Sequence, residues 1–297
     1  MSEMTARKFA ALVAILAVTV GALTACSNGG ESDAAPIDQA KQRLGEYVSD
    51  TTRIAGYRIT PTAIEMTAGE PPSRETIFVS GENAPTRQPV ADPALPRTVP
   101  GKDFPLDESL ELAERLVEEC PGDSTVEVHA ISAGVAGTRA TCDGEASVAY
   151  LGDTELEPVA DATSAKGIAQ LWSEIETAGL GSLLTRISID VTDDEGGDQM
   201  IVTVLDSPRN RAYQWHRGLR QPSSSVNSPR TKPAKESFNL SDVPADKVGA
   251  LMEKIRNDLP PSDAIGHLSV TQRDGHIVLV ATDPNFRELA AVRVDIG

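Results

Sequence analysis

The densest group of residues suited to ligand chemistry lies between Asp206 and Glu236, where basic and aromatic side chains occur without any acidic residue. Tyr213 and Trp215 alternate along one expected strand, so their rings should share a face. Guanidinium groups beside them could hold phosphates through paired hydrogen bonds, while the rings could stack on sugars. The predicted binding surface consists of Arg209, Arg211, Tyr213, Trp215, His216, Arg217 and Arg220. The alternative is that this segment folds back on the acidic body with Trp215 buried beneath it.

The linear motifs of nucleophilic catalysis and phosphate binding do not occur in the sequence. It contains no GxSxG, SxxK or HExxH motif and no glycine run with phosphate-loop spacing. We therefore predict no catalytic residue, no cofactor and no metal site. A pair of catalytic carboxylates far apart in sequence would escape this search.

Two segments invite comparison with metal sites. His267 and His276 flank the turn "QRDG" and could face each other across a hairpin, with Asp274 as the nearest third ligand. The run "DVTDDEGGDQ", residues 190–199, gathers carboxylates around a Gly-Gly turn but lacks the spacing of an EF-hand calcium loop. We interpret both as solvated hairpin ends.

Length and composition restrict the class of protein. A chain of 297 residues favours one large or two medium domains, and 40% hydrophobic residues with only 4% aromatics predict mainly aliphatic cores. The 27 basic against 44 acidic residues give a net charge of −17. This charge argues against general nucleic-acid binding and against adhesion to an anionic bilayer.

The N-terminal segment has the features of an export signal. Arg7 and Lys8 precede "FAALVAILAVTVGA", an apolar run of secretory length that is too short to cross a bilayer comfortably. "LTAC", which ends at Cys26, resembles the lipobox of bacterial lipoproteins. This resemblance implies that residues 1–25 are a signal peptide and that Cys26 carries a diacylglyceryl group. The alternatives are an ordinary secretory signal with a chance cysteine, or a short core helix.

The segment after Cys26 is small, polar or acidic, so residues 26–36 should form a flexible tether of roughly 15 to 20 Å. The expected location is the cell membrane, with the protein held by its lipid on the extracytoplasmic face. The order of elements and the strand "AYQWHRG" also resemble uncharacterised lipoproteins of high-GC Gram-positive bacteria, and this resemblance implies no function.

These features favour a non-catalytic binding or positioning role at the outer face of the cytoplasmic membrane. The partners considered are the membrane itself, through the lipid on Cys26, and an anionic envelope polymer, a lipid headgroup or an envelope protein; nucleic acid is not expected. Two other roles stay open, a carrier of a lipid or other hydrophobic ligand and a wall-polymer hydrolase or transferase.

The other two cysteines suit an exported protein. With Cys26 assigned to the lipid, Cys120 and Cys142 form an even pair in a compartment where disulfides persist, so we predict that they are bonded. Two buried free thiols are the alternative. No CxxC spacing favours metal or redox chemistry.

The elements that position these residues recur twice along the chain. Each half reads as an amphipathic helix, strands, a Pro-rich connection, a second helix and further strands, with Phe104 and Phe238 as matching landmarks. We predict an α+β fold with two tandem similar domains, residues 37–157 and 163–297. Each domain should be an antiparallel sheet with helices packed on one face. A single larger sheet with the two halves interleaved is the alternative.

Overall fold

A computed structural model describes residues 36–60, 63–69, 74–79, 86–90, 97–120, 124–142, 145–191, 198–206, 211–227, 236–260 and 264–294. In these ranges, no helix has both the length and the apolar character required to cross a bilayer. The elements form two antiparallel sheets with helices, so the predicted α+β class is confirmed.

The first repeat contains two helices, a short 3-10 helix and the strands of one sheet. Its elements are α1 (Pro36–Tyr47), β1 (Arg53–Thr60), β2 (Ala63–Ala68), β3 (Glu75–Val79), β4 (Thr86–Pro89), β5 (Val99–Pro100), η1 (Gly101–Asp103), α2 (Leu106–Glu119), β6 (Ser124–Ser132), β7 (Val135–Cys142), β8 (Glu145–Leu151) and β9 (Thr154–Glu155). The strand order is β4-β3-β2-β1-β6-β7-β8-β9, with β5 paired to β1.

The second repeat forms a separate sheet. Its elements are α3 (Ala165–Thr177), β10 (Leu184–Asp190), β11 (Gln199–Asp206), β12 (Arg211–Gly218), β13 (Ser223–Asn227), η3 (Leu240–Asp242), α4 (Ala245–Asp258), β14 (His267–Arg273), β15 (His276–Thr282) and β16 (Glu288–Arg293). The strand order is β13-β12-β11-β10-β14-β15-β16.

The two repeats share one topology. In each sheet, the first strand after the first helix pairs antiparallel with the first strand after the second long helix: β1 with β6, and β10 with β14. The remaining strands then extend the sheet outward on both sides of this central pair. Two sheets of matching order agree with tandem similar domains and rule out one interleaved sheet. The predicted limits 37–157 and 163–297 stay a prediction.

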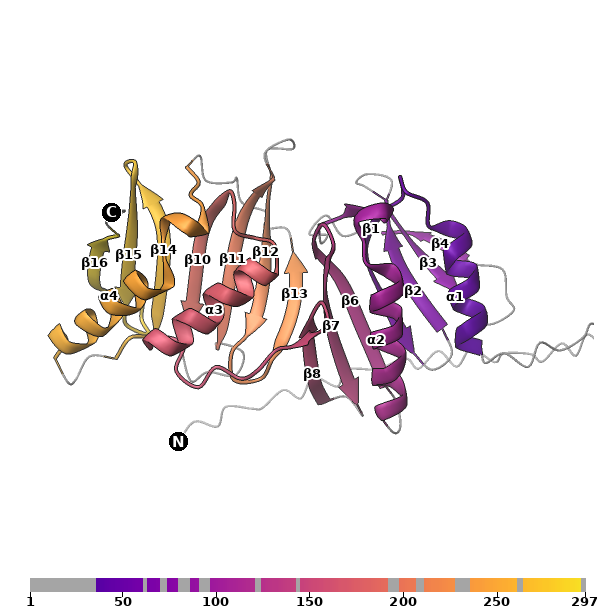
Figure 1. The fold of residues 1–297 in the computed structure, drawn as a ribbon, viewed down its shortest axis with the longest axis horizontal. Coiled ribbons are helices and arrows are strands. Elements are labelled where there is room, and N and C mark those ends of the chain that lie inside the picture. Colours follow the sequence, from indigo (N-terminus) through magenta and orange to yellow (C-terminus); the bar gives the residue numbers. More distant parts are fainter. Residues whose placement is uncertain are drawn as a thin grey trace, which may run out of the picture. The chain divides into compact units, whose positions relative to one another are not determined.

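Helices cover one face of each sheet because their apolar positions recur every three to four residues. In α3, Ile168, Leu171, Trp172 and Ile175 are all buried, as the spacing predicts. Figure 1 shows α3 and α4 lying across the same face of the second sheet, and α1 and α2 across a face of the first. The strands contribute the inward-facing side chains of each core, because successive side chains of a strand point to opposite faces. In β2, for example, Ile64 and Met66 are fully buried.

The disulfide predicted between Cys120 and Cys142 is confirmed. Cys120 is the C-cap of α2 and Cys142 is the last residue of β7, so the bond joins the end of the covering helix to the sheet beneath it. The Cα atoms are 5.6 Å apart, within the usual range for a disulfide.

Candidate functional site

The predicted binding surface lies on β12, and much of it faces the protein interior. Tyr213 is 6% exposed, while Trp215 and Arg217 are fully buried. The alternation of these residues does place them on one face, but β12 pairs with β11 and β13, and this face packs into the core. The stacking surface expected from Trp215 and Arg217 is therefore internal, as in the alternative of a buried Trp215.

The other four predicted residues have different surroundings. Arg211 is exposed at the start of β12, and Arg220 forms an ion pair with Asp198. His216 is half-buried, and its ring nitrogens form hydrogen bonds with Gln199 and Asn227. Arg209 lies outside the described residues. Of the seven, the structure brings the buried three together and leaves Arg211 and Arg220 on the surface.

Arg217 belongs to a buried ion pair that joins the sheet to α3. Its Nε and Nη2 atoms donate hydrogen bonds to the two carboxylate oxygens of Glu174 at 2.8 and 2.9 Å. The remaining donors reach the carbonyl oxygens of Glu157, Gly218 and Leu219. Because these partners use the whole guanidinium fork, Arg217 is a structural residue.

A second buried network connects the two repeats. Trp215 Nε1 donates to Ser224 Oγ at 2.9 Å, and this oxygen lies 3.0 Å from His129 Nε2 on β6 of the first repeat. Gly137 makes the contact sterically feasible, because a Cβ atom there would lie 2.4 Å from His129 Nε2. A histidine beside a serine can activate it as a nucleophile. Here Ser224 is buried and also accepts the hydrogen bond of Trp215, so we assign the pair a structural role.

Burial of His129 predicts that the protein loses stability in mild acid. Burial lowers the pKa of His129 from 6.5 to about 4, so the unfolded chain binds the proton first as the pH falls. Above pH 6.5 the folded protein therefore keeps the full stability that this group contributes, and it loses this contribution progressively between pH 6.5 and pH 4. We expect the free energy of unfolding to fall by about 2 kcal/mol between pH 7.5 and pH 5 from this group.

Urea unfolding at a series of pH values measures this loss. The matched control is His129→Gln, whose stability should vary less steeply over the same window whatever its value at pH 7.5. An identical pH slope in the two proteins would contradict the assignment to His129.

The structure also contains two clefts at matching places in the two repeats. The first lies between the start of α2 and a hairpin of the sheet, and the second lies between the segment that precedes α4 and the corresponding hairpin. The first cleft has a volume of about 530 Å³ and is lined by Pro105, Glu108, Ser109, Glu111, Leu112, Arg115, Gly134, Ala136, Gly152 and Asp153. The second cleft, of 390 Å³, is lined by Ser237, Phe238, Asp242, Gln272, Gly275, His276, Ile277, Arg293 and Val294. Neither was predicted from the sequence.

Three pairs of corresponding residues, one from each repeat, line the two clefts. Gly134 and Gly275 occupy corresponding turns with φ of 76° and 74°, a backbone conformation that favours glycine. The next matching pair is Ala136 and Ile277. Their carbonyl oxygens accept hydrogen bonds from the third pair, Gly152 and Val294, at 2.8 and 2.9 Å. The two repeats therefore share the cleft as well as the topology.

The side chains at these positions make the two clefts different. The first has the smaller residues Ala136 and Gly152 and carries Glu108, Glu111 and Asp153 against Arg115. The second has Ile277 and Val294 and carries Asp242 against Arg293, with His276 beside the arginine. The first cleft is therefore the wider and more acidic, and the second is narrower with balanced charge.

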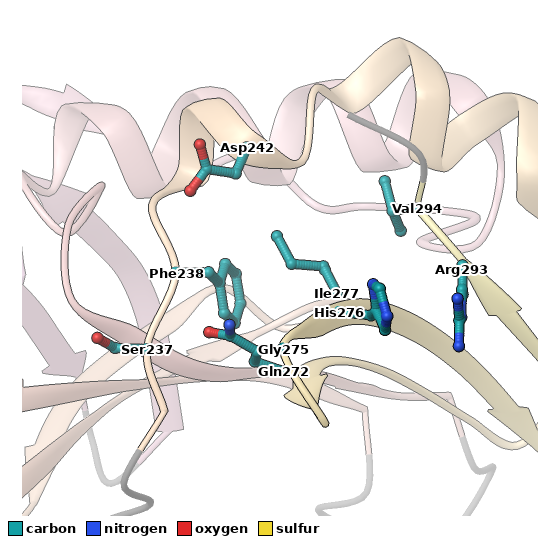
Figure 2. Close-up of a pocket in the computed structure, with 9 residues that line it drawn as sticks. All are labelled: Ser237, Phe238, Asp242, Gln272, Gly275, His276, Ile277, Arg293 and Val294. Carbon is teal, nitrogen blue, oxygen red and sulfur yellow. The ribbon is translucent and has the colours of Figure 1, made fainter. Parts of the chain in front are cut away.

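Figure 2 shows how polar groups are divided in the second cleft. Asp242 lies above Phe238 and the Gln272 amide lies below its ring, while His276 and Arg293 lie beyond Ile277. One carboxylate oxygen of Asp242 accepts a hydrogen bond from the backbone N–H of Asn239 at 2.9 Å, which holds it at the end of η3. The carboxylate of Asp242 and the two basic side chains thus lie at different ends of the cleft.

Gln272 is the unusual residue of this cleft. Leu268, Val270 and Gln272 alternate along β14, and the two aliphatic residues are each 1% exposed in the core. Gln272 continues this inward row and pairs with buried Ile277. Its Oε1 atom is buried without a hydrogen-bond partner among the described residues. Native proteins seldom leave such an acceptor unpaired, so the amide is a candidate for ligand contact.

The sequence contains one signal for this residue. In "HLSVTQ", a glutamine occupies the register of the apolar positions, and the first repeat has Ala130 at the matching place opposite Ala136. The polar residue is therefore specific to the second repeat.

The structure places the two histidines considered as metal ligands at opposite ends of one hairpin. His267 pairs with Thr282, whereas His276 pairs with Arg273 at the other end of the same hairpin, so the idea that the two histidines face each other is wrong. His267 instead forms a 2.8 Å hydrogen bond with Asp190. Most of the acidic run 190–199 lies outside the described residues. In the part of the chain that is described, no three His, Cys, Asp or Glu side chains are grouped to hold a metal ion.

Comparison with known proteins adds little to this geometry. No protein-family model matches the chain, and no curated protein matches it. Among solved structures, the chain is similar to the crystal structure of Proliferating Cellular Nuclear Antigen from Entamoeba histolytica, with 10% identity and a TM-score of 0.15 over 86% of this chain and 93% of that one. A similarity of this size supports no inference about function.

Proposed function

We propose that the protein is a lipid-anchored component of the cell envelope with a non-catalytic binding role at the outer face of the cytoplasmic membrane. The observation that carries the proposal is "LTAC" at residues 23–26, placed after a basic start and an apolar run of secretory length. The first described helix begins at Pro36, so about ten residues separate Cys26 from the folded body. A flexible polar tether of this length has an average end-to-end distance of roughly 15 to 20 Å.

The two clefts support a binding role for the folded body. The second cleft presents charged and amide groups around an apolar floor, the mixture typical of sites that hold small polar ligands. A protein fixed to the membrane needs only modest affinity for a neighbouring ligand, because the anchor raises their effective concentration.

The anchor predicts that Cys26→Ser abolishes lipid attachment. In cells fed an alkyne-bearing fatty acid, the natural chain should become labelled and migrate as the cleaved form. The Cys26→Ser chain should incorporate no label and keep its N-terminal segment, since the acceptor thiol and the cleavage signal are both lost.

The double variant Cys120→Ala/Cys142→Ala is the matched control, because it keeps Cys26 as its single cysteine. It should be labelled like the natural chain. Equal labelling of the Cys26→Ser chain would refute the proposed anchor.

A further inference from the structure

We infer that the second cleft binds a short zwitterionic peptide, with its ammonium group toward Gln272 and Asp242 and its carboxylate toward Arg293 and His276. This inference deepens the proposed binding role and rests on it.

The amide of Gln272 lacks a hydrogen-bond partner at its oxygen among the described residues. Gln272 Oε1 is a hydrogen-bond acceptor that is buried without a partner, so it requires an N–H or O–H donor. Asp242 lines the same cleft and adds a negative charge that is fixed in place by η3. A protonated amine satisfies both groups, because it supplies several N–H donors together with a positive charge.

Two basic side chains lie at the other end of the cleft. Arg293 and His276 are exposed side chains at the edge of the cleft, and neither has an ion pair among the described residues. The planar guanidinium of Arg293 matches a carboxylate through two parallel hydrogen bonds. This side therefore suits the carboxyl end of the same ligand.

Apolar residues occupy the middle of the cleft. Phe238 and Ile277 lie between Asp242 and the basic pair in Figure 2, and Val294 lies above that pair. All three are buried residues that line the cleft. They suit the small apolar side chains of a dipeptide. The volume of 390 Å³ lies toward the lower end of the range of about 300 to 1,000 Å³ for small-molecule sites.

The cleft of the first repeat lacks the residues that we assign to ligand binding in the second. Ala130 replaces Gln272 at the matching position, and the lining of the first cleft is predominantly acidic. It offers no buried amide acceptor at this position and should not bind the same ligand. The first cleft can therefore serve as an internal control in binding experiments.

Titration calorimetry of the full chain in detergent tests the inference with three probes: alanylalanine, its N-acetyl derivative and its C-terminal amide. We expect alanylalanine to bind saturably at millimolar or lower concentration, and each cap to weaken binding by about tenfold or more. Gln272→Leu should weaken binding of the free dipeptide and reduce its sensitivity to acetylation, with Asp242 still present. Arg293→Gln should weaken binding and reduce its sensitivity to amidation, with His276 still present.

Arg115→Gln in the first cleft is the matched control and should bind alanylalanine like the natural chain. The melting temperature of Gln272→Leu should equal or exceed that of the natural chain, because the substitution removes an unpaired buried acceptor. A lower melting temperature with unchanged binding would assign Gln272 a structural role and overturn the inference.

The inference is also overturned if alanylalanine does not bind, or if the capped peptides bind equally well. Fatty-acid labelling at Cys26 is independent of these titrations. A failure of the lipid anchor proposal can therefore be distinguished from a failure of the peptide-binding proposal.

Discussion

Replacing Arg217 with methionine should lower the free energy of unfolding by about 4 kcal/mol, the largest effect we expect from a single substitution in this chain. The natural side chain is fully buried and bonded to both carboxylate oxygens of Glu174, whose side chain is only 13% exposed. Methionine fills most of the space but leaves a carboxylate in the interior without its cation. Urea unfolding followed by circular dichroism measures the loss.

Two further variants separate the ion pair from general packing. Arg217→Met combined with Glu174→Leu should recover much of the lost stability, because the unpaired charge is removed. Arg220→Met is the matched surface control. Arg220 also pairs with an acidic residue, Asp198, but its side chain is 59% exposed, so the expected loss is less than about 1 kcal/mol. Equal losses for Arg217→Met and Arg220→Met would contradict the importance of burial.

Removing the disulfide by Cys120→Ala/Cys142→Ala should lower the free energy of unfolding by about 3 kcal/mol. The bonded residues are separated by 22 positions, so the bond restricts a sizeable loop in the unfolded chain. In the folded chain it joins the end of α2 to β7. The measurement is the urea midpoint with and without a reducing agent.

The double variant supplies the control for this prediction. Reduction should shift the midpoint of the natural chain toward that of the variant and leave the variant unchanged. A natural chain whose midpoint is insensitive to complete reduction would show that the bond contributes little to stability.

The buried basic strand shows where sequence reasoning reached its limit. Alternation correctly predicted that Tyr213 and Trp215 share a face, because successive side chains of a strand point to opposite sides. It could not tell which face is covered. Glu174, the partner of Arg217, lies 43 positions earlier on a helix, and only the packing of α3 on the sheet brings the two charges together.

The clefts depend even more on tertiary contacts. Each is built from a helix start, a hairpin turn and the end of the next strand, which meet only when the strands pair in register. Ser237 and Arg293 line one cleft although 56 positions separate them. No local motif marks such a site, and the single trace in the sequence is a glutamine in an apolar register.

By itself, the sequence determined the α+β class, the recurrence of elements, the helices of the second repeat and the pairing of Cys120 with Cys142. These depend on local periodicity, on turn residues and on a count of cysteines, all of which are properties of the linear chain. It also supplies the whole basis for the proposed anchor at Cys26. Only the tertiary structure decided that Arg217 and Trp215 are interior residues and that Gln272 faces a cleft. Burial and pairing depend on which faces of distant elements meet, and that is set by the packing of the entire sheet and its helices.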